Sequence, residues 1–254
     1  MTHGDSLLIL GELRRVAEER RLRAADPALT ERVQSVKRYQ QRRFELTYAD
    51  LLSSVRHGAA ARFFLDELYG PTDFKQRDAQ FERVVPALVR LFPNEIVRTV
   101  STIARLHALS ESLDTEMARH LVSPDITAGG YQRAWQRTGR REDRLLQIEL
   151  TLMVGRALEH YTRNPVIRTT LRLMRAPAEV AGLASLQRFL ESGFDAFRKM
   201  RGASEFLQKV EARERTLLEV LFSSHTTVAS RGGSGNRDKA MSGNAASPPT
   251  RQPD

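Results

Sequence analysis

Residues 62–78 of the chain read RFFLDELYGPTDFKQRD, and this stretch decides how we interpret the fold. Its first half is an apolar helical segment that stops at Gly70-Pro71. Glycine can adopt the left-handed conformation that closes a helix, and proline cannot continue one. The pattern therefore predicts a helix that ends in a sharp corner. The apolar side chains that gather before this corner are Phe63, Phe64, Leu68 and Tyr69.

The second half of the stretch begins another predicted helix. Thr72 or Asp73 can cap the backbone N–H groups of its first turn. Five of the chain's 16 Phe and Tyr residues fall between Phe63 and Phe81. We therefore expect the hydrophobic core to be centred on this corner. The apolar residues that the second helix carries are Phe74, Phe81, Val84 and Val85.

The composition is typical of a soluble helical protein. Apolar residues make up 41% and charged residues 28% of the 254 residues, and a chain of this length can bury a sizeable core. No run of about 18 apolar residues is present, so no transmembrane helix is expected. The apolar segment Leu7–Leu10 has no basic segment before it and Glu12 and Arg14 after it. We therefore expect no secretory signal and a cytoplasmic location.

The charge and the cysteine content narrow the range of functions. The chain has no cysteine, which excludes disulfides, thiolate metal sites and thiol catalysis. Its net charge is +9, and 35 of its 40 basic residues are arginine. Arginine presents a fork of N–H donors that suits carboxylates and phosphates. This charge is compatible with an anionic partner, but it does not specify a fold.

Apolar residues recur every three to four positions through most of the chain, which predicts α-helices. We expect an all-α, compact bundle of roughly seven to nine helices that forms a single domain over residues 1–223. From residue 224 to 254 Gly, Ser, Asn, Pro and Thr dominate, which predicts a disordered tail. The predicted helical segments are 5–24, 27–55 (which continues or restarts after Thr47), 58–68, 73–92, 96–122, a short helix within 125–139, 140–163, 165–174, 178–200 and 203–222.

Proline and glycine set the expected limits of these helices. Pro27 follows Asp26 at the position of a first helical turn. Pro86 lies inside a predicted helix and should kink or divide it. Gly129-Gly130 should interrupt the segment 125–139, and Ala176-Pro177 should form a short joint between two helices.

Helix geometry accounts for several charged residues of the first two predicted helices. Arg20, Arg21 and Arg23 follow the apolar pattern of the first helix and suit the negative end of its dipole. Lys37 belongs to the polar face of the second helix. We expect this polar face of the second helix to be solvated, as most charged faces are.

The strongest candidate for chemistry lies in the long predicted helix 96–122. His107, Glu111 and Asp114 follow one another at spacings of four and three, which places them on one helix face. Such a trio can bind a divalent metal ion if partner helices supply further ligands. The interpretation that we favour is that these side chains make polar contacts at a helix–helix edge.

His107 and His160 are also candidate haem ligands, because histidine is a common axial ligand of haem iron. A haem site needs a histidine that faces a large apolar cavity, and a single helical histidine is more often structural. We therefore expect no cofactor.

Two groups of arginines are candidate anion-binding faces. The first lies beside Tyr39 and Phe44 in the second predicted helix, and the second lies near Trp135. Nucleic-acid binding needs clustered charge together with an element that reads the ligand. No helix-turn-helix signature is present and acidic residues are interspersed, so we favour a solvated basic face. The six arginines are Arg38, Arg42 and Arg43 in the first group, and Arg140, Arg141 and Arg144 in the second.

Parts of the sequence resemble the signature segments of an uncharacterised all-helical family of Gram-negative bacteria, a domain of unknown function. The resemblance implies an all-helical fold over most of the chain, and it implies no activity and no catalytic residues. The segments that carry it are 62–86, with Phe63-Phe64 and Gly70-Pro71; 106–111, with His107-Ala108; and 182–214, with Gly193-Phe194.

These observations favour a non-enzymatic interaction or regulatory module that offers a helical groove to a protein or to a small apolar ligand. The chain lacks a Walker loop, a Rossmann fingerprint, a nucleophile elbow and a zincin motif, so an enzyme is not favoured. The first alternative is a nucleic-acid or anion binder that uses the arginine faces. The second is a metal- or haem-dependent protein centred on His107. No membrane partner is expected.

Overall fold

A computed structural model describes residues 2–67, 75–91 and 93–223. These residues contain α-helices and no strand, which confirms the predicted all-α class. The described part of the chain has twelve helices, however, more than the seven to nine that the sequence predicts. The helices are α1 (Thr2–Ala24), α2 (Pro27–Thr47), α3 (Ala49–Ser53), α4 (Gly58–Glu67), α5 (Lys75–Leu91), α6 (Asn94–Arg119), α7 (Ala128–Thr138), α8 (Arg141–Thr162), α9 (Pro165–Leu173), α10 (Arg175–Val180), α11 (Ala184–Met200) and α12 (Ser204–Phe222).

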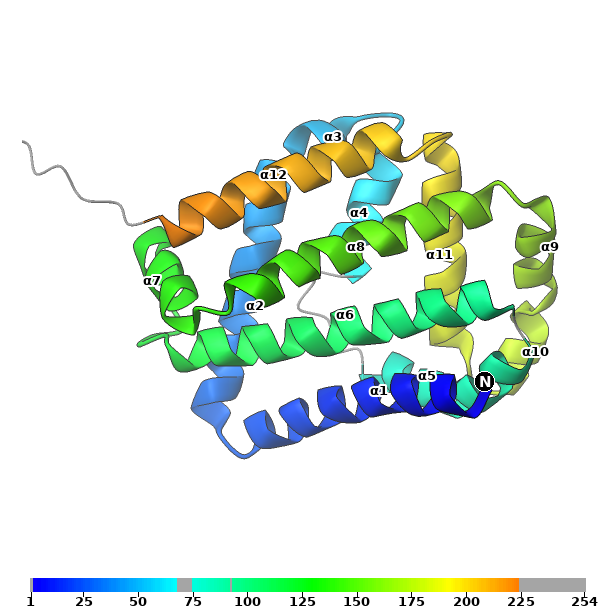
Figure 1. Cartoon of the computed structure of the whole chain (residues 1–254), viewed down its shortest axis with the longest axis horizontal. Helices are drawn as coiled ribbons and strands as arrows, with labels where there is room; N and C mark the ends of the chain where they lie inside the picture. Colours follow the sequence, from blue (N-terminus) through cyan, green and yellow to red (C-terminus); the bar gives the residue numbers. More distant parts are fainter. Residues whose placement is uncertain (1, 68–74, 92, 224–254) are drawn as a thin grey trace, which may run out of the picture. The chain divides into compact units, whose positions relative to one another are not determined.

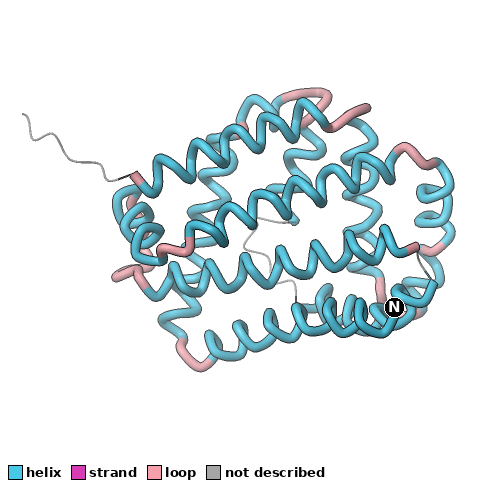
Figure 2. Tube along the Cα trace, viewed as in Figure 1, coloured by secondary structure: helices cyan, strands magenta, loops and turns pink. Residues whose placement is uncertain are grey.

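Long helices lie side by side in one layer, and others cross behind them (Figure 1). Within the layer α1 packs along α6, α6 along α8, and α8 along α12. Behind it α2 crosses α6, and α11 crosses α8 and packs against α4 and α5. The tube in Figure 2 shows that short loops join most of the neighbouring helices. Helix α6 therefore has neighbours on several sides, which positions its polar residues inside the bundle.

In the first half of the stretch 62–78, the two phenylalanines of α4 are buried in the core, as predicted. Phe63 and Phe64 are 7% and 2% exposed. The Phe64 ring lies 5.8 Å from that of Phe197 and 5.6 Å from that of Phe206, measured between centroids. These rings belong to α4, α11 and α12, so the aromatic residues of α4 join the two helices nearest the C-terminus to the bundle. The corner itself, residues 68–74, lies outside the described residues, as does the predicted tail, 224–254.

Helix α5, which begins in the second half of the stretch, contributes to a separate cluster. Val85 and Val89 of α5 pack with Ile9 and Leu13 of α1 and are fully or nearly fully buried. A further cluster joins α2, α6, α7 and α12 around Tyr131. The buried side chains of the described residues therefore form several clusters, rather than the one centre that the sequence predicts.

Most of the additional helices come from breaks within predicted segments. The segment from Pro27 to Val55 divides because α2 ends at Thr47 and α3 covers only Ala49–Ser53. The chain then turns into α4 at Gly58, where a Cβ atom would lie 2.7 Å from the carbonyl oxygen of Leu52. Because such an approach is too close for a side chain, glycine permits this turn.

Three of the expected helix breakers lie inside helices. Pro86 does not divide α5, which continues to Leu91. Its neighbours Val85 and Val89 on the same helix are buried. Gly129-Gly130 fall in the first turn of α7, where the Thr127 hydroxyl oxygen accepts a hydrogen bond from Gly130 N. Pro177 lies in the first turn of α10. The first N–H groups of a helix have no intrahelical acceptor, so the missing N–H of proline costs little there.

Two predicted helix starts are confirmed by their capping bonds. The Asp26 carboxylate accepts from Leu29 N and precedes Pro27, the first residue of α2. The Asn164 side chain likewise accepts from Val166 N before α9. Local capping chemistry is therefore readable from the sequence at both sites. None of the described helices combines the length and the apolar character needed to cross a bilayer.

Candidate ligand-binding pocket

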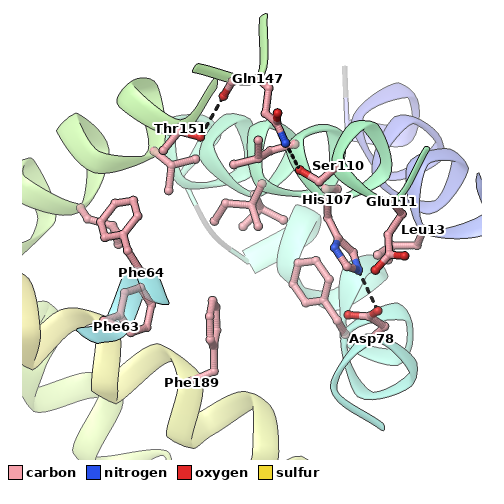
Figure 3. Close-up of a pocket in the computed structure, with 18 of the residues that line it drawn as sticks. Leu13, Phe63, Phe64, Asp78, His107, Ser110, Glu111, Gln147, Thr151 and Phe189 are labelled. Atoms are coloured by element: carbon pink, nitrogen blue, oxygen red, sulfur yellow. Dashed lines mark hydrogen bonds and ion pairs between the residues drawn. The ribbon is translucent and has the colours of Figure 1, made fainter. Parts of the chain in front are cut away.

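A pocket of about 170 Å³ lies among α1, α2, α4, α5, α6, α8 and α11 (Figure 3). One side of it is apolar and includes Phe63 and Phe64 from α4 and Phe189 from α11. The other side is polar, and α6 supplies more of its side chains than any other helix does (Figure 3). The polar lining consists of Lys37, Gln40, Asp78, His107, Ser110, Glu111, Asp114, Gln147 and Thr151.

The spacing of polar residues in α6 produces the polar side of the pocket. His107, Ser110, Glu111 and Asp114 recur at three- and four-residue intervals, so their side chains lie on one face of the helix. The structure thus brings together on one face the three residues that the sequence singles out. Apolar residues of α6 on neighbouring faces, such as Leu113, pack into the core and fix the orientation of the helix.

Glu111 is the centre of a buried ion network. Its carboxylate is 3% exposed and accepts hydrogen bonds from Arg23 Nη2 at 2.6 Å and from Lys37 Nζ at 2.7 Å. Arg20 Nη2 lies 3.7 Å from the same carboxylate. Burial raises the pKa of Glu111, but the charges of Lys37 and Arg23 more than offset this effect and lower it to about 2. The carboxylate is therefore negatively charged at neutral pH, and it ties α6 to α1 and α2.

A second carboxylate continues the network toward α5. Asp78 Oδ2 lies 2.9 Å from Arg20 Nη1 and 3.0 Å from His107 Nε2. Arg20 is only 14% exposed, and it lies between Asp78 and Glu111. One arginine of α1 thus contacts both acidic side chains, one on α5 and the other on α6.

Asp114 differs from Glu111 although it lies on the same face. It is 6% exposed, and its Oδ1 accepts a hydrogen bond from Gln40 Nε2 at 3.0 Å. Burial raises the pKa of Asp114, the charge of Glu111 raises it further, and Lys37 opposes the rise. Asp114 is therefore the acid of this face that most readily holds a proton.

Side chains of α8 complete the polar wall. Gln147 Nε2 donates to Ser110 Oγ at 2.8 Å, and Thr151 Oγ1 donates to the backbone carbonyl of Gln147, also at 2.8 Å (Figure 3). Arg144 Nη1 donates to Gln147 Oε1 at 3.2 Å. The amide of Gln147 is thus held at both ends, and it fixes the position of Ser110 on the pocket wall.

The three residues of the predicted metal site have other partners. Glu111 pairs with three cationic side chains, His107 bonds Asp78, and Asp114 bonds Gln40. Within 2–67, 75–91 and 93–223, no group of three His, Asp or Glu side chains is placed to hold a metal ion. The metal site stays a prediction. The interpretation that we favour, polar contacts between helices, describes the geometry better than a metal site does.

The haem alternative gains no support from the two histidines. His160 is 67% exposed and lies 3.6 Å from a carboxylate oxygen of Glu95. His107 does line a pocket, but about 170 Å³ is far less than a haem group needs, and its Nε2 is bonded to Asp78.

Most of the predicted anion-binding arginines contact groups of the chain itself. Arg43 pairs with Glu214 at 3.1 Å, Arg140 with Asp143 at 2.7 Å, and Arg141 with Glu219 at 2.5 Å. Arg38 donates to Ser35 Oγ, and Arg42 is exposed. These groups do not form one uncompensated basic face, and anion binding stays a prediction.

Arg144, the sixth of these arginines, is inside the protein. It is 4% exposed, and its guanidinium carbon lies 3.9 Å from the centre of the Trp135 ring. Burial lowers the pKa of Arg144 from its usual value. An external phosphate cannot reach this side chain, so its role is to join α8 to α7.

The sequence pattern does not identify the cationic side chains that pair with Glu111. Arg20 and Arg23 were interpreted as dipole-complementing residues and Lys37 as part of a solvated face. Arg23 is 7% exposed, and it is buried against α6. The one available signal was the three-residue spacing of Arg20 and Arg23, which places both on the helix face that carries Leu13 and Val16. This pattern does not distinguish a buried arginine from a solvated one.

The fold and the pocket define a class of protein, an all-helical bundle with an internal pocket that is apolar on one side and ion-paired on the other. The chain belongs to the family described as Domain of unknown function (DUF8198), whose model matches residues 19–228. The predicted resemblance to an all-helical family of unknown function is therefore confirmed. Comparisons with curated proteins and with solved structures found no match.

Proposed function

We propose that this protein is a non-enzymatic binding module that holds a small amphipathic molecule in the pocket. The observation that supports the proposal is the two-sided lining, with phenylalanines on one side and the α6 polar face on the other. Pockets for small molecules are commonly apolar with a few placed polar groups that orient the ligand. The same combination occurs here at the meeting point of seven helices.

The volume of the pocket limits the size of the ligand. An apolar protein cavity of roughly 150 Å³ accepts a benzene molecule, and this pocket has about 170 Å³. A ligand with one aromatic ring, or a short aliphatic chain, and one small polar group therefore fits. The chain's own charges support binding rather than chemistry, because Glu111 is fully engaged with Arg23 and Lys37.

The proposal also suggests a regulatory role. A ligand in this pocket would contact α4 and α11 on its apolar side and α6 on its polar side. Binding would therefore stabilise the packing between the two layers of helices. A ligand that binds only the folded state stabilises it by about 2.7 kcal/mol at a concentration of 100 times Kd.

The test is a thermal unfolding series in the presence of toluene, phenol, benzylamine or benzoate. For a domain of this size about 1 kcal/mol raises Tm by roughly 2–4 °C, so a saturating ligand should raise Tm by about 5–10 °C. Val154 lines the pocket and is 5% exposed, so the phenylalanine ring in Val154→Phe would occupy the pocket. This variant should lose the response to every probe.

The matched control is Val180→Phe, the same substitution at a position of α10 that is 91% exposed. It should respond to each probe as the natural sequence does. The proposal fails if none of the four probes raises Tm, or if Val154→Phe responds as strongly as Val180→Phe.

A further inference from the structure

We infer that the pocket selects neutral ligands that carry a hydroxyl group on an apolar body, and that His107 and Ser110 bind this hydroxyl. The inference rests on the proposed function and names the chemical class of the ligand. It comes from the hydrogen-bonding capacity that remains on the polar wall once the contacts among the described residues have been counted.

The ring of His107 has a defined tautomer. Nε2 lies 3.0 Å from Asp78 Oδ2, a carboxylate oxygen that can only accept. Arg20 Nη2 lies 3.4 Å from the same nitrogen, but a guanidinium group can only donate. The shorter contact to the carboxylate places the ring proton on Nε2, and the neutral ring then has its lone pair on Nδ1.

The Nδ1 atom is available to a ligand. It makes no hydrogen bond to the described residues, and His107 is a lining residue of the pocket. Figure 3 shows this nitrogen on the side of the ring opposite Asp78, turned toward the space between Ser110 and the phenylalanines. His107 therefore offers the pocket one hydrogen-bond acceptor.

Ser110 offers a donor one helical turn further along the same face. Its Oγ accepts from Gln147 Nε2 at 2.8 Å, and this bond leaves its hydroxyl hydrogen free to turn toward a ligand. No acceptor for that hydrogen is found in the described part of the chain. Residues three apart on a helix are neighbours, so His107 and Ser110 present an acceptor and a donor on the same face of α6. A hydroxyl group can donate to the first and accept from the second.

The charges on the wall disfavour an ionic ligand. A cationic head group would meet Lys37, which already pairs with Glu111. An anionic head group would meet the carboxylates of Glu111 and Asp78, and the cations nearest to them are engaged. A group that must leave water needs a compensating partner, and the wall provides one to a neutral hydroxyl.

The apolar side of the pocket fits the rest of such a molecule. The rings of Phe63 and Phe189 lie 5.5 Å apart between centroids and are tilted by 34°. Both border the pocket opposite the polar wall (Figure 3). Aromatic rings pack favourably in tilted or offset arrangements, so an aromatic ring suits this side.

Phenol and toluene form the decisive pair of probes, because they have nearly the same size and differ in one hydroxyl. We would measure the Kd of both by calorimetry with the full-length protein. In Ser110→Ala the Kd of phenol should rise about three- to tenfold, the effect of one lost hydrogen bond, and the Kd of toluene should stay the same. The matched control is Ser112→Ala on the same helix, whose hydroxyl contacts Arg140 rather than the pocket.

A spectroscopic measurement on the natural sequence keeps the inference testable if a variant fails to fold. The ¹⁵N chemical shift of His107 Nδ1 should change when phenol binds, because this nitrogen accepts the hydroxyl proton, and it should not change with toluene. His107→Phe should bind toluene and lose the preference for phenol.

The outcomes separate this inference from the proposed function. Binding of toluene with no effect of Ser110→Ala on phenol overturns the hydroxyl site and leaves the binding module intact. Preferential binding of benzylamine or of benzoate has the same consequence. Absence of binding by all probes overturns both.

Discussion

At the scale of single residues, the two buried acids of α6 lie three positions apart and have opposite pKa shifts. Glu111 has three cationic neighbours, and its pKa is lowered to about 2. Asp114 has an amide as its hydrogen-bond partner, and burial raises its pKa. The difference lies in the ion pairs that the arginines of α1 and Lys37 of α2 make with the Glu111 carboxylate.

Glu111→Gln should lower the free energy of unfolding by about 3–5 kcal/mol at pH 7, because it leaves buried cations without their anion. Urea denaturation measures this loss. The exposed pair of Glu18 and Arg21, with side chains 53% and 71% exposed, provides a control. Glu18→Gln should cost far less than Glu111→Gln, because a solvent-exposed ion pair contributes little to stability, and equal losses in the two variants would contradict the network.

The pH dependence of stability has a sign that follows from Glu111. The folded-state pKa of about 2 lies below the usual value of 4.5, so the contribution is present above pH 4.5 and is lost as the pH falls toward 2. At about 1.4 kcal/mol for each pKa unit, it amounts to about 3 kcal/mol. Between pH 5 and pH 2 the natural protein should therefore lose this much more stability than Glu111→Gln does. Parallel curves for the two proteins would refute the assignment.

Asp114→Asn should have the opposite consequence. Because the folded-state pKa of Asp114 is raised, ionisation of this carboxyl destabilises the fold as the pH rises above its usual value of 3.8. Asparagine carries no charge, and its oxygen can still accept from Gln40. At pH 8 the variant should be as stable as the natural protein or more stable, by up to about 1 kcal/mol. A loss comparable to that of Glu111→Gln is the contrary result.

At the scale of secondary structure, the sequence predicts best what is decided locally. The caps at Asp26 and Asn164 and the long helix α6 depend on neighbouring residues and appear in the structure as expected. Whether the second helix continues or restarts after Thr47 was left open by the sequence, because the break at Tyr48 depends on contacts with other helices. Tyr48 is fully buried and donates to Glu214 of α12 at 2.8 Å, a contact that no local pattern reveals.

Two glycine substitutions test how the elements are joined. Gly58→Ala should destabilise the protein by about 1–3 kcal/mol, because its Cβ would lie 2.7 Å from the Leu52 carbonyl oxygen and the backbone would have to shift. Gly11→Ala in α1 meets nothing within 4 Å and should stabilise the helix by about 0.5–1 kcal/mol. Urea denaturation of both variants gives the comparison, and a gain for both would show that the α3–α4 joint is not tight.

At the scale of the whole molecule, the candidate site could be predicted only in part. The shared α6 face of His107, Glu111 and Asp114 follows from spacing, and all three residues line the pocket. Its partners Arg20 and Lys37 lie far away in the chain, so a local pattern cannot assign them. The sequence therefore predicts that this helix face is polar, and the tertiary fold turns it into the wall of a pocket.

The end of the helical bundle gives a prediction about the chain as a whole. The last carbonyl groups of α12 accept hydrogen bonds from two side chains of α7: Gln132 Nε2 donates to Ser223 O at 3.1 Å, and Gln136 Nε2 to Leu221 O at 3.1 Å. These carbonyl groups have their hydrogen-bond donors within residues 2–223. Deletion of residues 225–254 should therefore leave the Tm measured by calorimetry unchanged within about 2 °C. Deletion from residue 217 onward removes the buried Leu218 and Leu221 and should cost several kcal/mol. A fall of many degrees after the shorter deletion would mean that residues beyond 224 stabilise the helices.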